Sequence, residues 1–193
     1  MIRVHCDIIG VIGDGASGKD FVAERIADYG YIHVSASEIL RETIRNRGLI
    51  PTRELQTSIA NEVRLQHGGD YFVAEAHKRG LQHLQSERGL VMSGLYSRSE
   101  GLYIKRQLGR LAHVVIAPTD DINLRYERLR NRADGSRDVL DLKEFIQAHQ
   151  RENSGTTENE ANIASLAELA DAQIINDDDP VFLRDQLDKF IGV

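Results

Sequence analysis

Residues 13–20 read GDGASGKD and follow directly on the apolar run DIIGVI of residues 7–12. Their spacing is G-x-x-x-x-G-K, in which a buried strand ends, the chain turns back and a helix begins. Successive backbone N–H groups of such a loop point into one concavity, and the dipole of the following helix adds positive potential. The stretch therefore predicts a phosphate-binding loop in which Lys19 reaches the β- and γ-phosphates of a nucleotide. The candidate nucleotide-binding residues are Gly13, Asp14, Gly15, Ala16, Ser17, Gly18, Lys19 and Asp20.

Asp20 departs from the usual pattern, because a serine or threonine hydroxyl that binds Mg²⁺ is expected at this position. A carboxylate is also a good ligand for Mg²⁺, and an unpaired negative charge this close to a triphosphate would repel it. The alternative is that an acidic residue is favoured in the first turn of a helix by the helix dipole. Asp20 is therefore a candidate metal ligand, with helix stabilisation as the other interpretation.

Short apolar runs alternate with longer segments of helical period along the rest of the chain. This alternation is typical of a parallel sheet with helices on both faces. The predicted strands are residues 8–12, 31–36, 90–94, 112–118 and 172–176. The predicted helices are residues 19–30, 37–48, 52–69, 70–89, 119–132 and 142–152, a helix ending at residue 170, and residues 179–191.

Composition limits the class of protein. The chain has 193 residues, of which 41% are hydrophobic and 28% charged, so we expect one globular domain. Its net charge of −6 argues against nucleic acid as a partner. The single cysteine, Cys6, allows no internal disulfide, and no stretch is typical of a signal peptide or a membrane span. We therefore expect a cytoplasmic protein that does not bind membranes; its oligomeric state is not predicted.

Four further stretches complete a pattern with the loop. They are SEILRETIRNRG at 37–48, LVMSGLYSR at 90–98, RYERLRNRADGSRD at 125–138 and ADAQIIND at 170–177. Together the five resemble the P-loop nucleoside monophosphate kinase group, which includes adenylate, deoxynucleotide and dephospho-CoA kinases, and most of all an adenylate-kinase-like microbial branch. The resemblance implies a three-layer α/β/α P-loop fold with strand order 2-3-1-4-5, and ATP and Mg²⁺ as cofactors. It also implies a helical acceptor-binding insertion at about residues 35–88 and a lid at about 128–140.

The first two of these stretches contain the acceptor and metal residues that the resemblance implies. Glu38 and Arg41 match an acid and an arginine that holds the acceptor's phosphate; the alternative is an i,i+3 pair on a solvated helix face. Ser93 stands where relatives have an aspartate near Mg²⁺, so Ser93 and Asp20 together are the candidate metal ligands. Tyr96 stands at the usual arginine position, which makes Arg98 a candidate acceptor ligand or a surface charge.

The last two stretches resemble the arginine-bearing lid and the turn that passes the adenine. Arg128 and Arg132 are the candidate catalytic arginines, which would close over the transferred group and neutralise its oxygens. Arg125 and Arg130 fit an ordinary helix surface, and Arg137 and Arg151 are weaker candidates. Asn176 is either an adenine contact at a strand's carboxyl end or a residue that starts a turn.

The resemblance implies transfer of the γ-phosphoryl group of ATP to a small molecule that carries a phosphate. A ribo- or deoxyribonucleoside monophosphate is the expected acceptor. Dephospho-CoA is the alternative, and Glu38 would then be the base for its ribose hydroxyl. Because Ser93 and Tyr96 depart from the family pattern, two other classes stay open: a nucleotide-binding regulatory protein and a slow NTP hydrolase.

Overall fold

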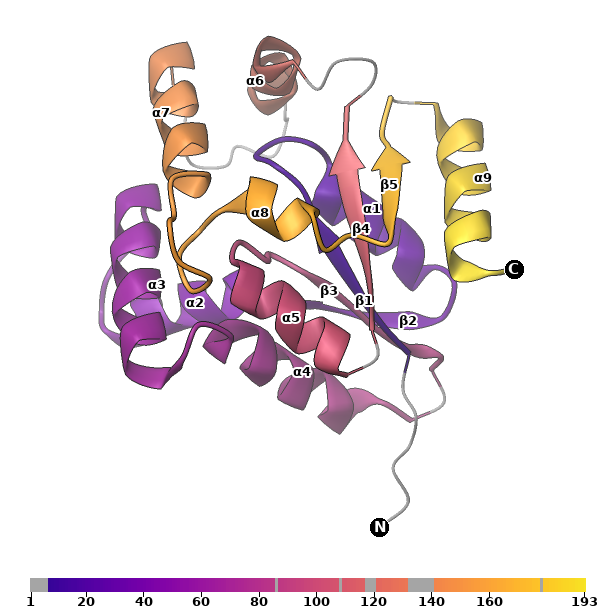
Figure 1. Cartoon of the computed structure of the whole chain (residues 1–193), viewed down its shortest axis with the longest axis horizontal. Coiled ribbons are helices and arrows are strands. Elements are labelled where there is room, and N and C mark those ends of the chain that lie inside the picture. The colour runs from indigo at the N-terminus through magenta and orange to yellow at the C-terminus, as the bar shows by residue number, and fades with distance from the viewer. Residues whose placement is uncertain (1–6, 86, 108, 117–120, 132–140, 178) are drawn as a thin grey trace.

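The central feature of the protein is a sheet of five parallel strands (Figure 1). The computed structural model describes residues 7–85, 87–107, 109–116, 121–131, 141–177 and 179–193. The strands are β1 (Asp7–Ile12), β2 (Tyr31–Ser35), β3 (Gly89–Ser93), β4 (Arg110–Val115) and β5 (Ala172–Ile175). They lie in the order β2-β3-β1-β4-β5, which confirms the predicted fold class and strand order.

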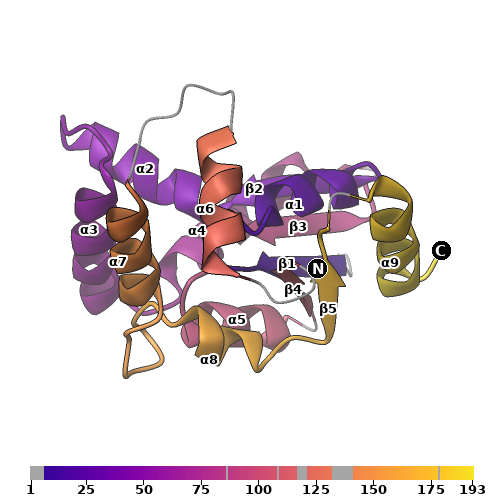
Figure 2. The same cartoon turned by 90° about the horizontal axis from the view of Figure 1, so that it is seen from above.

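Helices cover both faces of the sheet, because successive side chains of a buried strand point to opposite sides. Ile9 and Val11 of β1 pack in one cluster with apolar residues of α1 (Lys19–Ala27) and α9 (Pro180–Ile191). Ile8 and Ile12 belong to the opposite cluster, formed with α4 (Tyr71–His83), α5 (Arg98–Arg106) and α8 (Ile163–Ala167). Figure 2 shows α1 on one side of the sheet and α5 and α8 on the other.

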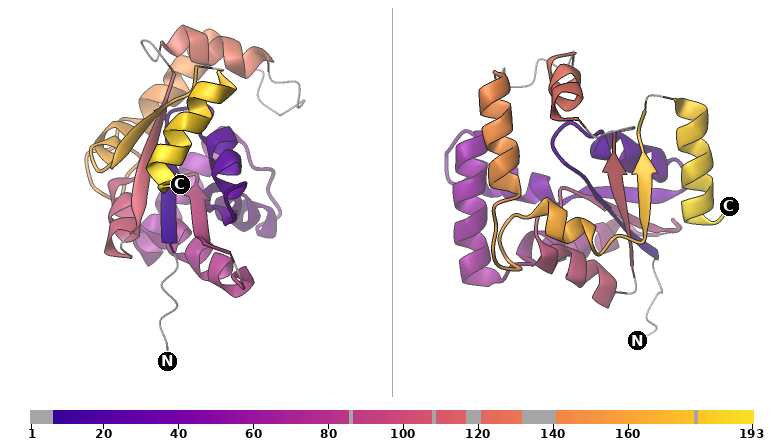
Figure 3. Two further views of the ribbon diagram at one scale, coloured as in Figure 1. Left: turned by 90° about the vertical axis from the view of Figure 1, so that its right-hand side faces the viewer. Right: turned by 45° about the horizontal axis from the view of Figure 1, so that its top comes forward.

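The helices around the sheet include two groups from separate parts of the chain. The helices α2 (Ala36–Asn46), α3 (Arg53–His67) and α4 lie between β2 and β3 in sequence, within the expected insertion. Later in the chain come α6 (Ile122–Asn131) and α7 (Leu142–Glu152). Figures 1 and 3 show α7 beside α3 and α6 near the ends of β4 and β5. Residues far apart in sequence thus meet at one end of the sheet.

The elements agree closely with the sequence pattern, with one helix missing from the prediction. The predicted helix 142–152 is observed with those bounds, whereas α8 ends at Ala167 and not at residue 170. The helix α5 was not predicted, although Ser97 and Glu100 form a capping box in which each side chain accepts the other's backbone N–H. Among the described residues, no helix is long and apolar enough to cross a membrane.

Candidate active site

The loop between β1 and α1 has the strained, close-packed geometry of an anion-binding site. Ala16 and Gly18 both have left-handed backbones, with φ of 63° and 87°, which curves the chain into a concave nest of N–H groups. Ser17 and Lys19 are buried within it, and the Ser17 hydroxyl has no hydrogen-bond partner among the described residues. A Cβ on Gly13 would lie 2.5 Å from that hydroxyl. These features fit a loop that holds the phosphates of a nucleotide.

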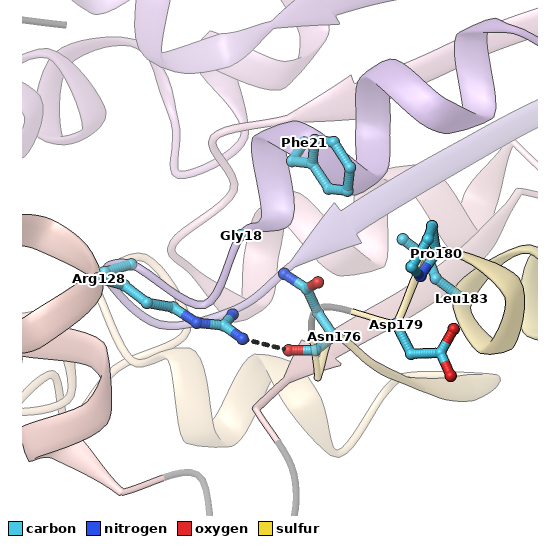
Figure 4. A pocket seen from close by; sticks show the side chains of 8 residues that line it. Gly18, Phe21, Arg128, Asn176, Asp179, Pro180 and Leu183 are labelled. Atoms are coloured by element: carbon cyan, nitrogen blue, oxygen red, sulfur yellow. Dashed lines mark hydrogen bonds between the residues drawn. The ribbon is translucent and has the colours of Figure 1, made fainter. Parts of the chain in front are cut away.

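On one side of the loop lies a cavity of about 330 Å³, drawn in Figure 4. Phe21 of α1, Arg128 of α6 and Pro180 of α9 are among its walls. Asn176 follows β5 and lies at the centre. Its side-chain amide donates a 3.0 Å hydrogen bond to the backbone carbonyl of Ser17, and its backbone carbonyl accepts one of 2.8 Å from Arg128. The mixture of a ring, a guanidinium and an amide suits a flat heterocycle. Asn176 was expected at the adenine and Arg128 over the transferred phosphoryl group, whereas in the structure both residues line this one cavity.

On the other side of the loop lies a second cavity, of about 310 Å³, enclosed by α1, α2, α3 and α7. Gly15 and Ala16 of the loop line it, so the loop separates the two cavities. The charged residues in its wall are Lys19, Arg41, Arg64 and Arg151, with Asp20 and Glu152 as the acids. An excess of cationic groups in a chain of net charge −6 favours an anionic occupant. We call this the acceptor cavity.

Helix α7 braces the loop from the acceptor side. Asp14 Oδ1 accepts a 3.1 Å hydrogen bond from Asn153 Nδ2 and lies 3.1 Å from His149 Nδ1. From α6, Arg125 donates to the Gly15 carbonyl at 3.3 Å. Asp14 was expected among the nucleotide-binding residues, and the structure places its carboxylate against α7. Its side chain therefore supports the shape of the loop.

Arg41 reaches the acceptor cavity, and Glu38 holds it there. Glu38 accepts hydrogen bonds from Arg41 Nε at 2.7 Å and from Arg45 at 2.6 Å. Burial alone would raise the pKa of the Glu38 carboxyl, but the two guanidiniums outweigh it and lower that pKa. Glu38 is not among the residues that line the cavity. The predicted pair therefore divides into one residue at the cavity and one that orients it.

Ser93 and Asp20, the candidate metal ligands, both lie near His33 of β2. The buried Ser93 hydroxyl is 3.0 Å from His33 Nε2. Burial lowers the pKa of His33, partly opposed by the carboxylates of Asp20 and Glu24. Within the described part of the chain, no group of three or more His, Cys, Asp or Glu residues could hold a metal. The residues present fit Mg²⁺ only in its usual mode with nucleotides, in which phosphate oxygens and water supply most of the ligands.

Arg98 is not brought to the acceptor cavity. It begins α5, and its guanidinium turns to α8, where it donates to the Ser165 carbonyl at 2.7 Å and to Glu168 at 3.0 Å. The expected role of Arg98 as an acceptor ligand therefore gains no support: Ser165 of α8 and Glu168, which follows α8, hold the side chain, and it is absent from the cavity wall. Arg132 and Arg137, expected in the lid, lie outside the described residues.

Tyr96 and Arg64 lie in the acceptor cavity although the sequence did not single them out as ligands. The Lys19 ammonium lowers the pKa of the Tyr96 phenol. Burial and the carboxylates of Glu152 and Asp20 raise that pKa by more in total, so the net shift is upward. The phenol is thus neutral near pH 7 and can donate a hydrogen bond into the cavity. The advance signal for Tyr96 was its place at the usual arginine position of the kinases that the chain resembles.

Known proteins resemble the chain in sequence and in fold. No family model matches it. A UPF0200 protein from Methanococcus vannielii is 29% identical over 189 residues, covering 95% of this chain and 90% of that protein. A UPF0200 protein from Thermococcus sibiricus is 27% identical, covering 88% of this chain and 86% of its own.

Solved structures share the fold at low sequence identity. Shikimate kinase from Acinetobacter baumannii, in complex with shikimate, has a TM-score of 0.57 at 14% identity, covering 96% of this chain and 91% of its own. TT1252 from Thermus thermophilus has a TM-score of 0.60 at 19% identity, covering 97% and 96%. A gluconokinase from Sinorhizobium meliloti has a TM-score of 0.52 at 16% identity, covering 99% and 94%. The chain therefore shares the fold of these proteins.

Proposed function

We propose that the protein is an ATP-dependent kinase that transfers the γ-phosphoryl group to a small acceptor bearing a phosphate, foremost a ribo- or deoxyribonucleoside monophosphate. The observation that carries the proposal is the position of the phosphate loop between two cavities, one with a ring and a guanidinium and the other lined by cationic groups. Lys19 lies in the loop and in the wall of the acceptor cavity. A donor and an acceptor in these cavities would meet at Lys19.

In this proposal the residues act by position and charge, as is general for phosphoryl transfer. Arg128 and Asn176 hold the base side of ATP, and the loop and Lys19 hold its phosphates. Arg41 holds the acceptor, in the orientation that Glu38 imposes. Mg²⁺, when bound beside Asp20, would neutralise part of the charge on the β- and γ-phosphates. Arg132 is proposed to act from the lid.

The lowered pKa of the Glu38 carboxyl favours an acceptor whose attacking oxygen is already anionic. A ribose hydroxyl, as in dephospho-CoA, benefits from a general base. Glu38 was the candidate for that base, but two arginines bind it and lower its pKa, which makes it a weak proton acceptor. A phosphate oxygen needs no base. This supports a nucleoside monophosphate over dephospho-CoA.

One observation supports a different class of function. Ser93 stands where the nucleoside monophosphate kinases that the chain resembles have an aspartate near the metal. Its hydroxyl lies within hydrogen-bond distance of the His33 ring. A metal site weakened in this way would suit a nucleotide-binding regulatory protein or a slow NTP hydrolase, which bind ATP but show no faster ADP release with any acceptor.

The test is ADP release from Mg·ATP with each ribo- and deoxyribonucleoside monophosphate and dephospho-CoA added singly. Lys19→Ala should abolish the reaction, while Lys78→Ala, an exposed lysine on α4 outside both cavities, should leave it unchanged. Strong acceleration by one acceptor names the substrate. A flat response across the panel, with ATP still bound, contradicts the kinase proposal for these acceptors.

A further inference from the structure

A buried arginine forms part of the wall of the acceptor cavity. Arg64 of α3 is only 7% exposed, yet it lines the cavity together with Arg41 and Arg151. One terminal nitrogen donates a 2.9 Å hydrogen bond to Oε1 of Glu100. Its Nε is also buried, and within the described ranges that atom has no hydrogen-bond partner. An unpaired buried donor is costly, so a native protein usually reserves such a position for water or a ligand.

Glu100 does not use up the hydrogen-bonding capacity of Arg64. The carboxylate is fully buried, and its other oxygen accepts the backbone N–H groups of Tyr96 at 2.7 Å and Ser97 at 3.0 Å. Part of its negative charge is therefore committed to the start of α5, where the helix dipole already favours it. A guanidinium carries five N–H donors, so the contact with one oxygen of Glu100 leaves donors for the cavity.

The same contacts hold Arg64 rigidly. Glu100 ties it to the first turn of α5, and the centre of the Phe72 ring lies 5.5 Å from the guanidinium carbon. A charged group that is already oriented loses little entropy when it binds a ligand. Arg64 thus combines burial, fixed orientation and spare donors at the wall of a cationic cavity.

We propose that Arg64 binds a phosphate group of the acceptor, in place of the usual arginine at whose position Tyr96 stands. This inference rests on the proposed function, because it takes the cavity to be the acceptor site. A planar guanidinium can give two parallel hydrogen bonds to phosphate, which a lysine or tyrosine cannot. The ATP phosphates are assigned to the loop, so the anion at Arg64 belongs to the second substrate.

The direct test follows the Nε–H signal of Arg64 by NMR. The loop is first filled with a non-hydrolysable ATP analogue and Mg²⁺, and the signal is assigned by its loss in Arg64→Lys. Inorganic phosphate is then added as the probe. We expect a saturable shift of the Arg64 signal and none at Arg47, which pairs with Glu62 across α2 and α3 outside the cavity. No saturable shift, an equal shift at Arg47, or a shift with acetate but not with phosphate overturns the proposal.

Binding measurements separate a ligand contact from a structural tie. We expect Arg64→Met to weaken binding of the nucleoside monophosphates by about 10- to 100-fold. Affinity for the parent nucleosides and for ATP should stay unchanged, as should every affinity in Arg47→Met. Should Arg64→Met not fold, Arg64→Lys keeps the charge but loses the planar fork, and it should still weaken monophosphate binding.

Glu100→Gln is the comparison for a purely structural role. If Arg64 only ties α3 to α5, Arg64→Met and Glu100→Gln lower the urea midpoint alike and leave monophosphate affinity unchanged, which overturns the inference. The kinase proposal fails separately: a phosphate-dependent Arg64 signal without accelerated ADP release contradicts the reaction and supports the phosphate site. Accelerated ADP release with unchanged monophosphate affinity in both Arg64 variants contradicts the phosphate site and supports the reaction.

Discussion

The amide of Asn176 donates a 3.0 Å hydrogen bond to the carbonyl of Ser17, which lies 159 residues earlier in the chain. Asn176 is 5% exposed and follows β5, whereas Ser17 belongs to the phosphate loop after β1. This contact ties the loop to the edge of the sheet where the cavity beside Arg128 lies. The shape of the loop therefore depends on a residue near the other end of the chain.

Replacing Asn176 should loosen the loop and destabilise the fold. Asn176→Ala leaves the Ser17 carbonyl without its partner, which should cost about 1–3 kcal/mol in the free energy of unfolding. ATP affinity should fall with it, measured by titration. Asn123→Ala is the control, because Asn123 is exposed and its amide donates to Asp121, directly before α6 and away from the loop. Equal stability and ATP affinity in the two variants would contradict this role of Asn176.

Gly18 should tolerate alanine far less well than Gly48, although both have left-handed backbones, with φ of 87° and 75°. A left-handed alanine costs about 1–2 kcal/mol at either site. A Cβ on Gly48 would meet nothing within 4 Å, whereas a Cβ on Gly18 would overlap the Asn176 amide. We therefore expect Gly48→Ala to lower stability alone, and Gly18→Ala to abolish ATP binding as well. Intact ATP binding in Gly18→Ala would show that Asn176 can move aside.

The stability of the protein should fall as the pH drops below about 6.5. Burial lowers the folded-state pKa of His33 and of His77 below their usual value of 6.5. Below that value the unfolded chain binds more protons than the folded one, so stability falls until the folded-state pKa is reached. His33→Gln should therefore show a smaller loss in urea midpoint between pH 7.5 and 5.5 than the original chain.

His77→Gln provides the comparison for that pH series. It should also reduce the acid sensitivity, because His77 is shifted by burial at the contact between α4 and α5, away from both cavities. Only His33→Gln should alter the Mg²⁺ dependence of ATP binding, since its ring meets Ser93. A pH profile unchanged by either substitution would contradict the assignment.

Replacing Arg41 should change the KM for the acceptor, whereas replacing Arg98 should not. Arg41 lines the acceptor cavity, so Arg41→Ala should raise the KM for the acceptor by about 10-fold or more, the scale of one charged hydrogen bond. Arg98 pairs with Glu168, which follows α8, so Arg98→Ala should leave this KM unchanged and lower stability by about 0.2–1 kcal/mol. A raised KM in Arg98→Ala would restore Arg98 as an acceptor ligand.

The fold and the phosphate loop were predictable because their signals are local. The spacing of Gly13, Gly18 and Lys19 and the apolar run before them lie within one short segment, and the structure places them at one turn between β1 and α1. The helix α5 was missed because its apolar residues Leu102, Tyr103 and Ile104 are consecutive, which gives no helical period. The local signal for its start is the capping box of Ser97 and Glu100, which does not depend on apolar period.

By itself, the sequence determined the five strands, most of the helices and the loop, because hydrophobic period and glycine spacing act over a few residues. Only the tertiary structure decided which charged side chains share a cavity. Arg64 meets Glu100 across 36 residues, and Arg98 meets Ser165 across 67. Such pairs depend on how helices pack around the sheet, and an arginine on a helix surface has the same local pattern whether it faces solvent or a cavity.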